Sequence, residues 1–94
     1  MIKLVRLVSG EELLCNLVET KESSIMVENI LIMIPTGEGK IGVADYMPYT
    51  EINKGVEIKD LHIIFMVDAI DQMAQAHKDK FGGLIIPSSK LVGV

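Results

Sequence analysis

Two runs of five consecutive apolar residues, at positions 30–34 and 63–67, constrain the fold of this chain most strongly. Each run has the length of a β-strand and is much shorter than the roughly 18 apolar residues that span a bilayer. A strand that is half-buried in a monomer alternates apolar and polar residues, whereas these two are apolar on both faces. Either the helix and tail that follow cover the second face, or another copy of the chain does. We favour another copy for at least one strand, because large apolar patches are rare on monomers.

The chain of 94 residues has room for one domain with one hydrophobic core. Runs of β-branched and alternating apolar residues predict five strands, at residues 2–8, 12–19, 25–34, 41–49 and 57–67. Pro35 is expected to end the third strand and Pro48 the fourth, because proline cannot donate to a central ladder. The sequence therefore predicts a mainly β fold, a strongly bent antiparallel sheet or small barrel over residues 1–67.

The pattern changes from strand to helix after position 67. Apolar positions then recur at helical spacing, at Ile70, Met73, Ala74, His77 and Phe81, with His77 expected at the boundary of the apolar stripe. Asp68 is a suitable N-cap, and Gly82 supplies a stop. We expect one amphipathic C-terminal helix at residues 68–82 and an apolar tail at 83–94, which complete a single domain over residues 1–94.

Composition limits the partners that the chain can have. Its net charge of −4 argues against a basic surface that binds nucleic acid without regard to sequence. The lone Cys15 suits a reducing compartment, and the first residues lack the pattern of a signal peptide. We therefore expect a cytoplasmic protein with no membrane partner, in which any RNA contact is local.

The motifs that suggest chemistry have simpler structural interpretations. Residues 37–42 match the letters of the dinucleotide-binding fingerprint, but they join two predicted strands instead of a strand and a helix, so a glycine-rich hairpin is expected. His62 and His77 are too few for a metal site, and Cys15 has no neighbouring base in the sequence. We expect no catalytic residue, no metal and no cofactor, and an enzyme is the least favoured class.

Three segments resemble the motifs of the Sm-like family, which includes the LSm proteins and bacterial Hfq. Residues 7–18 look like the first half of the first Sm motif, with a glycine turn and the small Cys15 in the second strand. Residues 28–32 are similar to the end of that motif, and Asn29 stands where the family has its base-contacting asparagine. Residues 58–63 resemble the second motif, in which Arg-Gly or Lys-His occupies the positions of Lys59 and Asp60.

This resemblance, over residues 2–67, implies a strongly bent five-stranded antiparallel barrel. It also implies a closed homo-oligomeric ring, in which the fourth strand of one copy pairs with the fifth of the next, with about five to seven subunits in cyclic symmetry. The ring would bind single-stranded RNA in RNA processing or regulation. Asn29 would then hydrogen-bond a base edge, and Lys59 would contact phosphate or base, once per subunit around the central opening.

The chain also departs from the family pattern. Val27 stands where Sm proteins place an aromatic residue or histidine that stacks on a base, and Glu28 replaces the family methionine. Asp60 adds a negative charge beside Lys59, and the helix follows the strands instead of preceding them. These changes predict a weaker uridine pocket, in a divergent and bacteriophage-encoded member. The alternative is a ring-forming module that recognises another protein and binds no nucleic acid.

Overall fold

The structure is a computed structural model that describes residues 1–82, so the predicted tail at 83–94 lies outside the described residues. The described part contains six strands and one helix: β1 (Ile2–Leu7), β2 (Glu12–Thr20), β3 (Ser24–Gly37), β4 (Lys40–Asp45), β5 (Val56–Lys59), β6 (Ile63–Asp68) and α1 (Asp71–Phe81). Two 3-10 turns, Ile52–Lys54 and Asp60–His62, precede β5 and β6. The prediction of a mainly β chain with one C-terminal helix is confirmed for this part.

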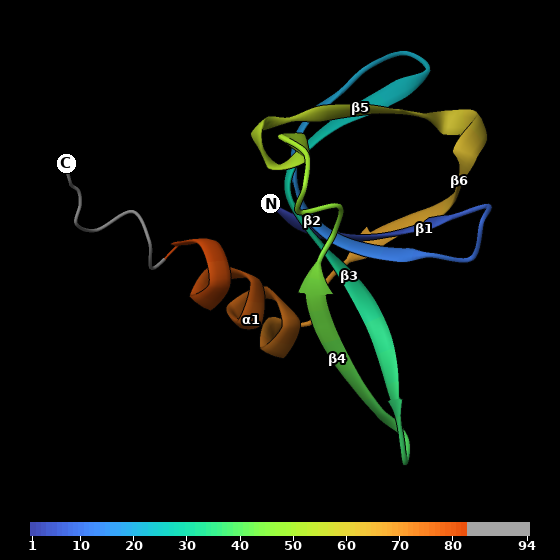
Figure 1. Cartoon of the computed structure of the whole chain (residues 1–94). Coiled ribbons are helices and arrows are strands. Elements are labelled where there is room, and N and C mark those ends of the chain that lie inside the picture. The colour runs from blue at the N-terminus through green and yellow to red at the C-terminus, as the bar shows by residue number, and fades with distance from the viewer. Residues whose placement is uncertain (83–94) are drawn as a thin grey trace, which may run out of the picture.

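All six strands belong to one antiparallel sheet that bends strongly around β3 (Figure 1). The order along the sheet is β4-β3-β2-β1-β6, and β5 pairs separately with β3. The first part of β3, residues 24–27, pairs with β5, and its second part, residues 31–37, pairs with β4. Within residues 1–82, β4 and β6 at the two ends of this order, and also β5, each pair with one strand only, so the sheet is not closed.

The structure has six strands where five were predicted, because the expected strand at 57–67 is divided. The 3-10 turn Asp60–His62 separates β5 from β6, and the two halves pair with different parts of the sheet. The amide of Asp60 donates to the carbonyl of Ser23 (2.9 Å), whereas the carbonyl of His62 accepts from the amide of Val8 (2.8 Å). Since β5 lies against β3 and β6 against β1, the chain has to turn between them.

The hairpin of β3 and β4 also differs in length from the expectation. Pro35 does not end β3, which continues to Gly37, and β4 ends at Asp45, before Pro48. Proline is tolerated because β2 pairs with β3 only as far as Ile32, so beyond that point β3 has β4 as its one neighbour. The predicted glycine-rich turn is confirmed: Glu38 (φ 54°) and Gly39 (φ 74°) form a two-residue connection with positive φ at both positions.

One hydrophobic core lies inside the bend and draws on β1, β2 and β3. Its buried members, each at most 3% exposed, are Val5, Leu13, Cys15, Ile25, Val27 and Ile30. Partly buried residues of β5 and β6, such as Ile58 and Met66, pack against it. Because neighbouring residues of a strand point to opposite faces, Leu14 and Leu31, which pair across β2 and β3, are buried on the other side of the sheet.

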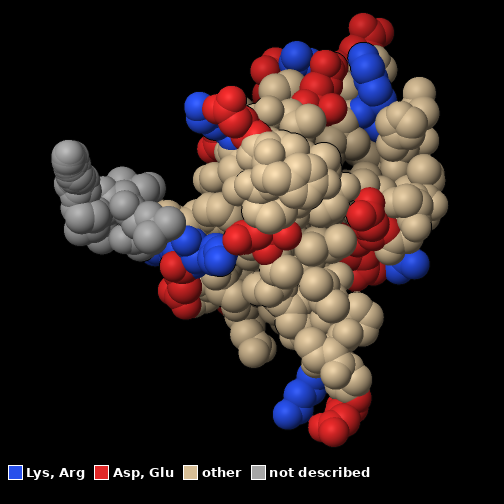
Figure 2. Space-filling model, viewed as in Figure 1, with Lys and Arg blue, Asp and Glu red and all other residues tan. Residues whose placement is uncertain are grey.

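The charged side chains form no continuous patch of one sign on the face shown in Figure 2. Lys and Arg side chains are interspersed there with Asp and Glu side chains, around a broad area without charge. This mixed surface agrees with the small negative net charge of the sequence.

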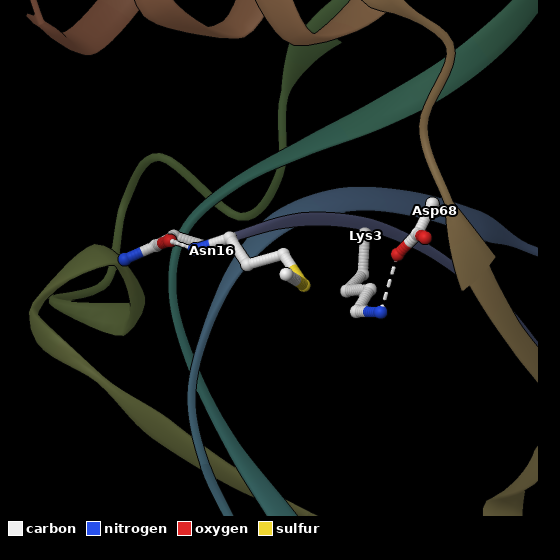
Figure 3. A network of polar contacts seen from close by, with 4 residues as sticks. Lys3, Asn16 and Asp68 are labelled. Atoms are coloured by element: carbon white, nitrogen blue, oxygen red, sulfur yellow. Dashed lines mark hydrogen bonds and ion pairs between the residues drawn. The ribbon is translucent and has the colours of Figure 1, made fainter.

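The helix begins at Asp71, three residues after the predicted start. Asp68 is the last residue of β6, and its carboxylate pairs with the ammonium of Lys3 on β1 instead of capping the helix (Figure 3). Ile70 precedes the helix without a side-chain cap. No helix within residues 1–82 has the length and apolar character to cross a membrane.

We predict that Glu38→Asn stabilises the hairpin by about 1 kcal/mol, because asparagine adopts positive φ more readily than glutamate. Urea unfolding measures the change in free energy. Glu22→Asn, in the connection between β2 and β3 where φ is not positive, removes the same charge and serves as the control. Equal effects of the two substitutions would show that charge, and not the turn conformation, determines the change.

Candidate functional site

Asn29 lies in a β-bulge in the middle of β3. Between the pairs Leu14↔Leu31 and Asn16↔Glu28, one residue of β2 faces two residues of β3, Asn29 and Ile30. Asn29 has a φ of +53°, which asparagine tolerates better than other non-glycine residues. The bulge interrupts the ladder, so the backbone groups of these two residues need other hydrogen-bond partners.

Two side chains from distant parts of the chain provide those partners. Nε2 of His77, in α1, donates to the carbonyl oxygen of Asn29 at 2.6 Å, and the carbonyl can only accept. Oδ1 of Asn53, in the turn before β5, accepts from the amide of Ile30 at 2.8 Å. His77 is therefore buried (4% exposed), whereas the helical pattern predicted a boundary position.

A cavity of about 510 Å³ lies between the bulge and α1. The polar and aromatic side chains that line it are those of Asn16, Asn29, Asp71, Gln75, His77, Lys78 and Phe81. The rings of His77 and Phe81 are in contact, with centroids 4.8 Å apart and planes at 44°. The cavity thus combines amides, one aromatic pair, one cation and one carboxylate.

The two asparagines of this cavity differ in their hydrogen bonds. Oδ1 of Asn16 accepts from the N-terminal ammonium of Met1 at 2.7 Å (Figure 3), and its Nδ2 donates to the carboxylate of Glu28 at 3.1 Å. The side-chain amide of Asn29 has no hydrogen bond to any residue in the part of the chain that the structure describes. Asn16 is therefore held in place, while the amide of Asn29 can bind a ligand.

Lys59 and Asp60 lie together at another place, beside the β2–β3 connection. Lys59 pairs with Ser24 in the sheet, and Ser24 Oγ donates to the carboxylate of Glu57 at 2.6 Å. The ammonium of Lys59 is 3.7 Å from the same carboxylate. The hydrogen bond from Ser24, and then the charges of Lys59 and Lys21, lower the pKa of Glu57. The positive charge of Lys59 is thus partly offset by an ionised neighbour.

Of the four residues that the Sm-like resemblance places in one site, Lys59 and Asp60 follow each other at the end of β5, whereas Val27 and Asn29 lie on β3. Lys59 pairs with Ser24 in the sheet. Asn29 lies five residues beyond Ser24 on β3, which corresponds to about 16 Å along the strand. Val27 is fully buried in the core opposite Val56, so its side chain offers no surface to a base. The sequence did not reveal that His77 and Asn53 bond the backbone of the bulge, or that Phe81 lines the same cavity as Asn29. An asparagine inside an apolar strand was the one available signal of a bulge.

Cys15 and the possible metal ligands of residues 1–82 were the groups most open to a chemical role. Burial raises the pKa of the Cys15 thiol to about 12, so the thiol is protonated and enclosed at neutral pH. No group of three His, Cys, Asp or Glu side chains is arranged there to hold a metal ion. Neither the models of protein families nor the curated proteins include a match to this chain.

We predict that His77→Ala lowers the free energy of unfolding by about 1–3 kcal/mol, because it leaves the carbonyl of Asn29 without its partner in a half-buried place. Thermal or urea unfolding measures the loss. Gln72→Ala, at an exposed position of the same helix, is the matched control and should change stability by less than about 0.5 kcal/mol. Equal stability of the two variants would contradict the proposed role of His77 in the bulge.

Proposed function

We propose that this chain is the subunit of an Sm-like ring, in which about five to seven copies assemble edge to edge and bind single-stranded RNA. The observation that carries the proposal is the open sheet, whose two end strands, β4 and β6, both expose apolar side chains. The resemblance of the sequence to the Sm motifs is the reason for proposing this family. The bend of the sheet at β3 supports the small barrel that the family implies.

The two open edges fit a contact between one end of the sheet and the opposite end of the next copy. On β4, Ile41 and Val43 are 61% and 38% exposed, and on β6, Ile64 and Val67 are 55% and 46% exposed. An edge strand with apolar side chains is a template for pairing with another chain. Pairing of β4 with β6 joins unlike surfaces, and such contacts produce a ring when the rotation between copies closes.

The RNA contacts in this proposal are local and repeated. Each subunit contributes the side-chain amide of Asn29, which has no hydrogen-bond partner among residues 1–82, for a base edge and the ammonium of Lys59 for a phosphate. Asn29 is about 16 Å along β3 from Ser24, the residue that pairs with Lys59, so an RNA strand that contacts both residues extends over more than one nucleotide. Weak contacts gain affinity when they are repeated around a ring. Repetition therefore matters for a subunit that offers RNA only a few cations.

One observation favours a second function, a ring that recognises a protein and not RNA. Glu57 is hydrogen-bonded and close to Lys59, and Asp60 follows directly in the chain, so this corner carries carboxylates beside its lysine. Carboxylates repel phosphates and can attract a basic polypeptide. The two functions share the ring and differ in what copurifies with it.

Assembly through the two edges is tested with one substitution on each. Ile41→Lys on β4 and Ile64→Lys on β6 should each reduce the assembly to monomers, because every contact then contains one blocked edge. A mixture of the two variants should form dimers, since one pair of intact edges remains. Light scattering coupled to gel filtration measures the masses. Val18→Lys, on the inner strand β2 at similar exposure, is the control and should keep the wild-type mass.

RNA binding is tested with labelled oligo-U and oligo-A at two salt concentrations. Lys59→Ala should weaken binding by about three- to tenfold and reduce the salt slope by about 1, as expected for one lost phosphate contact per site. Lys54→Ala, on the exposed turn before β5 where Lys54 pairs with Glu51, is the control. Absence of binding at tens of micromolar wild-type protein would contradict the RNA function. A copurified polypeptide without nucleic-acid absorbance would favour protein recognition instead.

A further inference from the structure

The cavity between the β-bulge and α1 lies at the end of the part of the chain that the structure describes. Its volume is about 510 Å³, and Gly82, the C-cap of α1, is one of its lining residues. The next apolar run of the sequence, residues 84–86, begins two positions later. Since consecutive Cα atoms are about 3.8 Å apart, the backbone keeps the Cα of Leu84 within about 8 Å of that of Gly82. We propose that Leu84, Ile85 and Ile86 fill this cavity in their own copy of the chain.

Most of the uncharged polar side chains that line the cavity already have hydrogen bonds within the protein. Asn16 uses both its oxygen and its nitrogen, and Gln75 donates from Nε2 to the carboxylate of Asp79 at 2.8 Å. Nε2 of His77 donates to a carbonyl of the bulge. An apolar occupant leaves these bonds intact, whereas a polar ligand has to compete for the same atoms. The bonds in the wall therefore favour apolar side chains as the occupant.

The rest of the lining offers apolar surface from both the sheet and the helix. Ile2 of β1 and Ala74 and Phe81 of α1 are each only partly buried within residues 1–82. The charged members, Asp71 and Lys78, are exposed, so their charges can stay in water while the stem of the lysine covers apolar side chains. Burial of apolar surface is the main favourable contribution to packing, and three consecutive branched side chains supply it here.

The end of α1 lets the chain turn towards the cavity. Gly82 keeps a helical conformation, and its amide donates to the carbonyl of Lys78. A second glycine follows at position 83, where helices commonly place a glycine that ends the helix in a left-handed conformation. Pro87 comes directly after the three apolar residues and has no amide to continue a strand. The apolar run is thus limited to the short stretch that can reach the wall of the cavity.

Attachment to the wall that it covers favours this occupant over a second copy. A segment joined by one glycine has a high effective concentration at the cavity, which a separate chain does not have. None of the described residues that line the cavity belongs to β4 or β6. The inference therefore does not rest on the proposed ring, whose edges stay available to other copies. Asn29 lines the same cavity, so the seated segment and an RNA base compete for access to it from the side of α1.

Methyl NMR of the full-length wild-type chain tests the contact directly. Nuclear Overhauser effects are expected from the methyl groups of Ile85 and Ile86 to the ring of Phe81 and the methyl group of Ala74. Their absence would overturn the inference. A sample that mixes copies labelled in isoleucine with copies labelled in phenylalanine reports only contacts between chains. Effects between Ile86 and Phe81 in that mixed sample would show that the tail of another copy fills the cavity, and would overturn the assignment to the same chain.

Hydrogen exchange gives a second readout. Ile85→Ser combined with Ile86→Ser removes apolar contacts and should speed the exchange of the α1 amides by about tenfold or more. Val92→Ser, beyond Pro87 in the same tail, is the matched control and should leave the exchange unchanged. Equal exchange in wild type and both variants would contradict the inference. The double variant should also keep the wild-type mass in light scattering, and a lower mass would show that these residues act at a subunit edge instead.

Discussion

The bulge at Asn29 is the feature on which the rest of the structure depends. It lies where β3 changes its outer partner from β5, at residues 24–27, to β4, at residues 31–37. The strand bends there, and the two backbone groups released from the ladder are bonded by His77 and Asn53. The bulge therefore coincides with the change of partner of β3 and links the helix to the sheet.

The helix has a structural role that its sequence alone does not reveal. Besides the bond from His77 to the bulge, Lys80 of α1 lies 3.3 Å from Asp45 at the end of β4. An exposed ion pair of this kind contributes little to stability, so the buried bond of His77 is the stronger link. The C-terminal helix, held at the bulge, forms one wall of the cavity there. Residues of β1, β2 and β3 line the other side.

Much of the fold follows from local patterns. The strand regions, a glycine-rich hairpin connection after residue 34 and the helix were all predicted, because alternation, glycine placement and helical spacing depend on neighbours in the chain. The division of residues 57–67 was not, since an apolar run does not reveal that its halves pair with β3 and β1. The end of β3 was misplaced for a similar reason: Pro35 stops a central strand but not a two-stranded hairpin.

The candidate site was less predictable than the fold. Motif resemblance identified Asn29 and Lys59, but their separation along β3 depends on sheet register, which the motif letters do not contain. Val27 was singled out because of what the family has at that position, and burial removes it from any surface. His77 bonds Asn29 across 48 positions of sequence, and Phe81 contacts His77 and lines the same cavity as Asn29, which no local pattern encodes.

Edge-to-edge assembly is the central claim, because both the ring and its repeated weak contacts depend on it. The sheet presents apolar side chains at two open ends, which a single copy leaves uncovered within the described residues. The most direct measurement is the absolute mass of the wild-type chain by sedimentation equilibrium over a wide concentration range. A constant mass of about five to seven times that of one chain is predicted. A single-chain mass that persists to millimolar concentration would contradict the account.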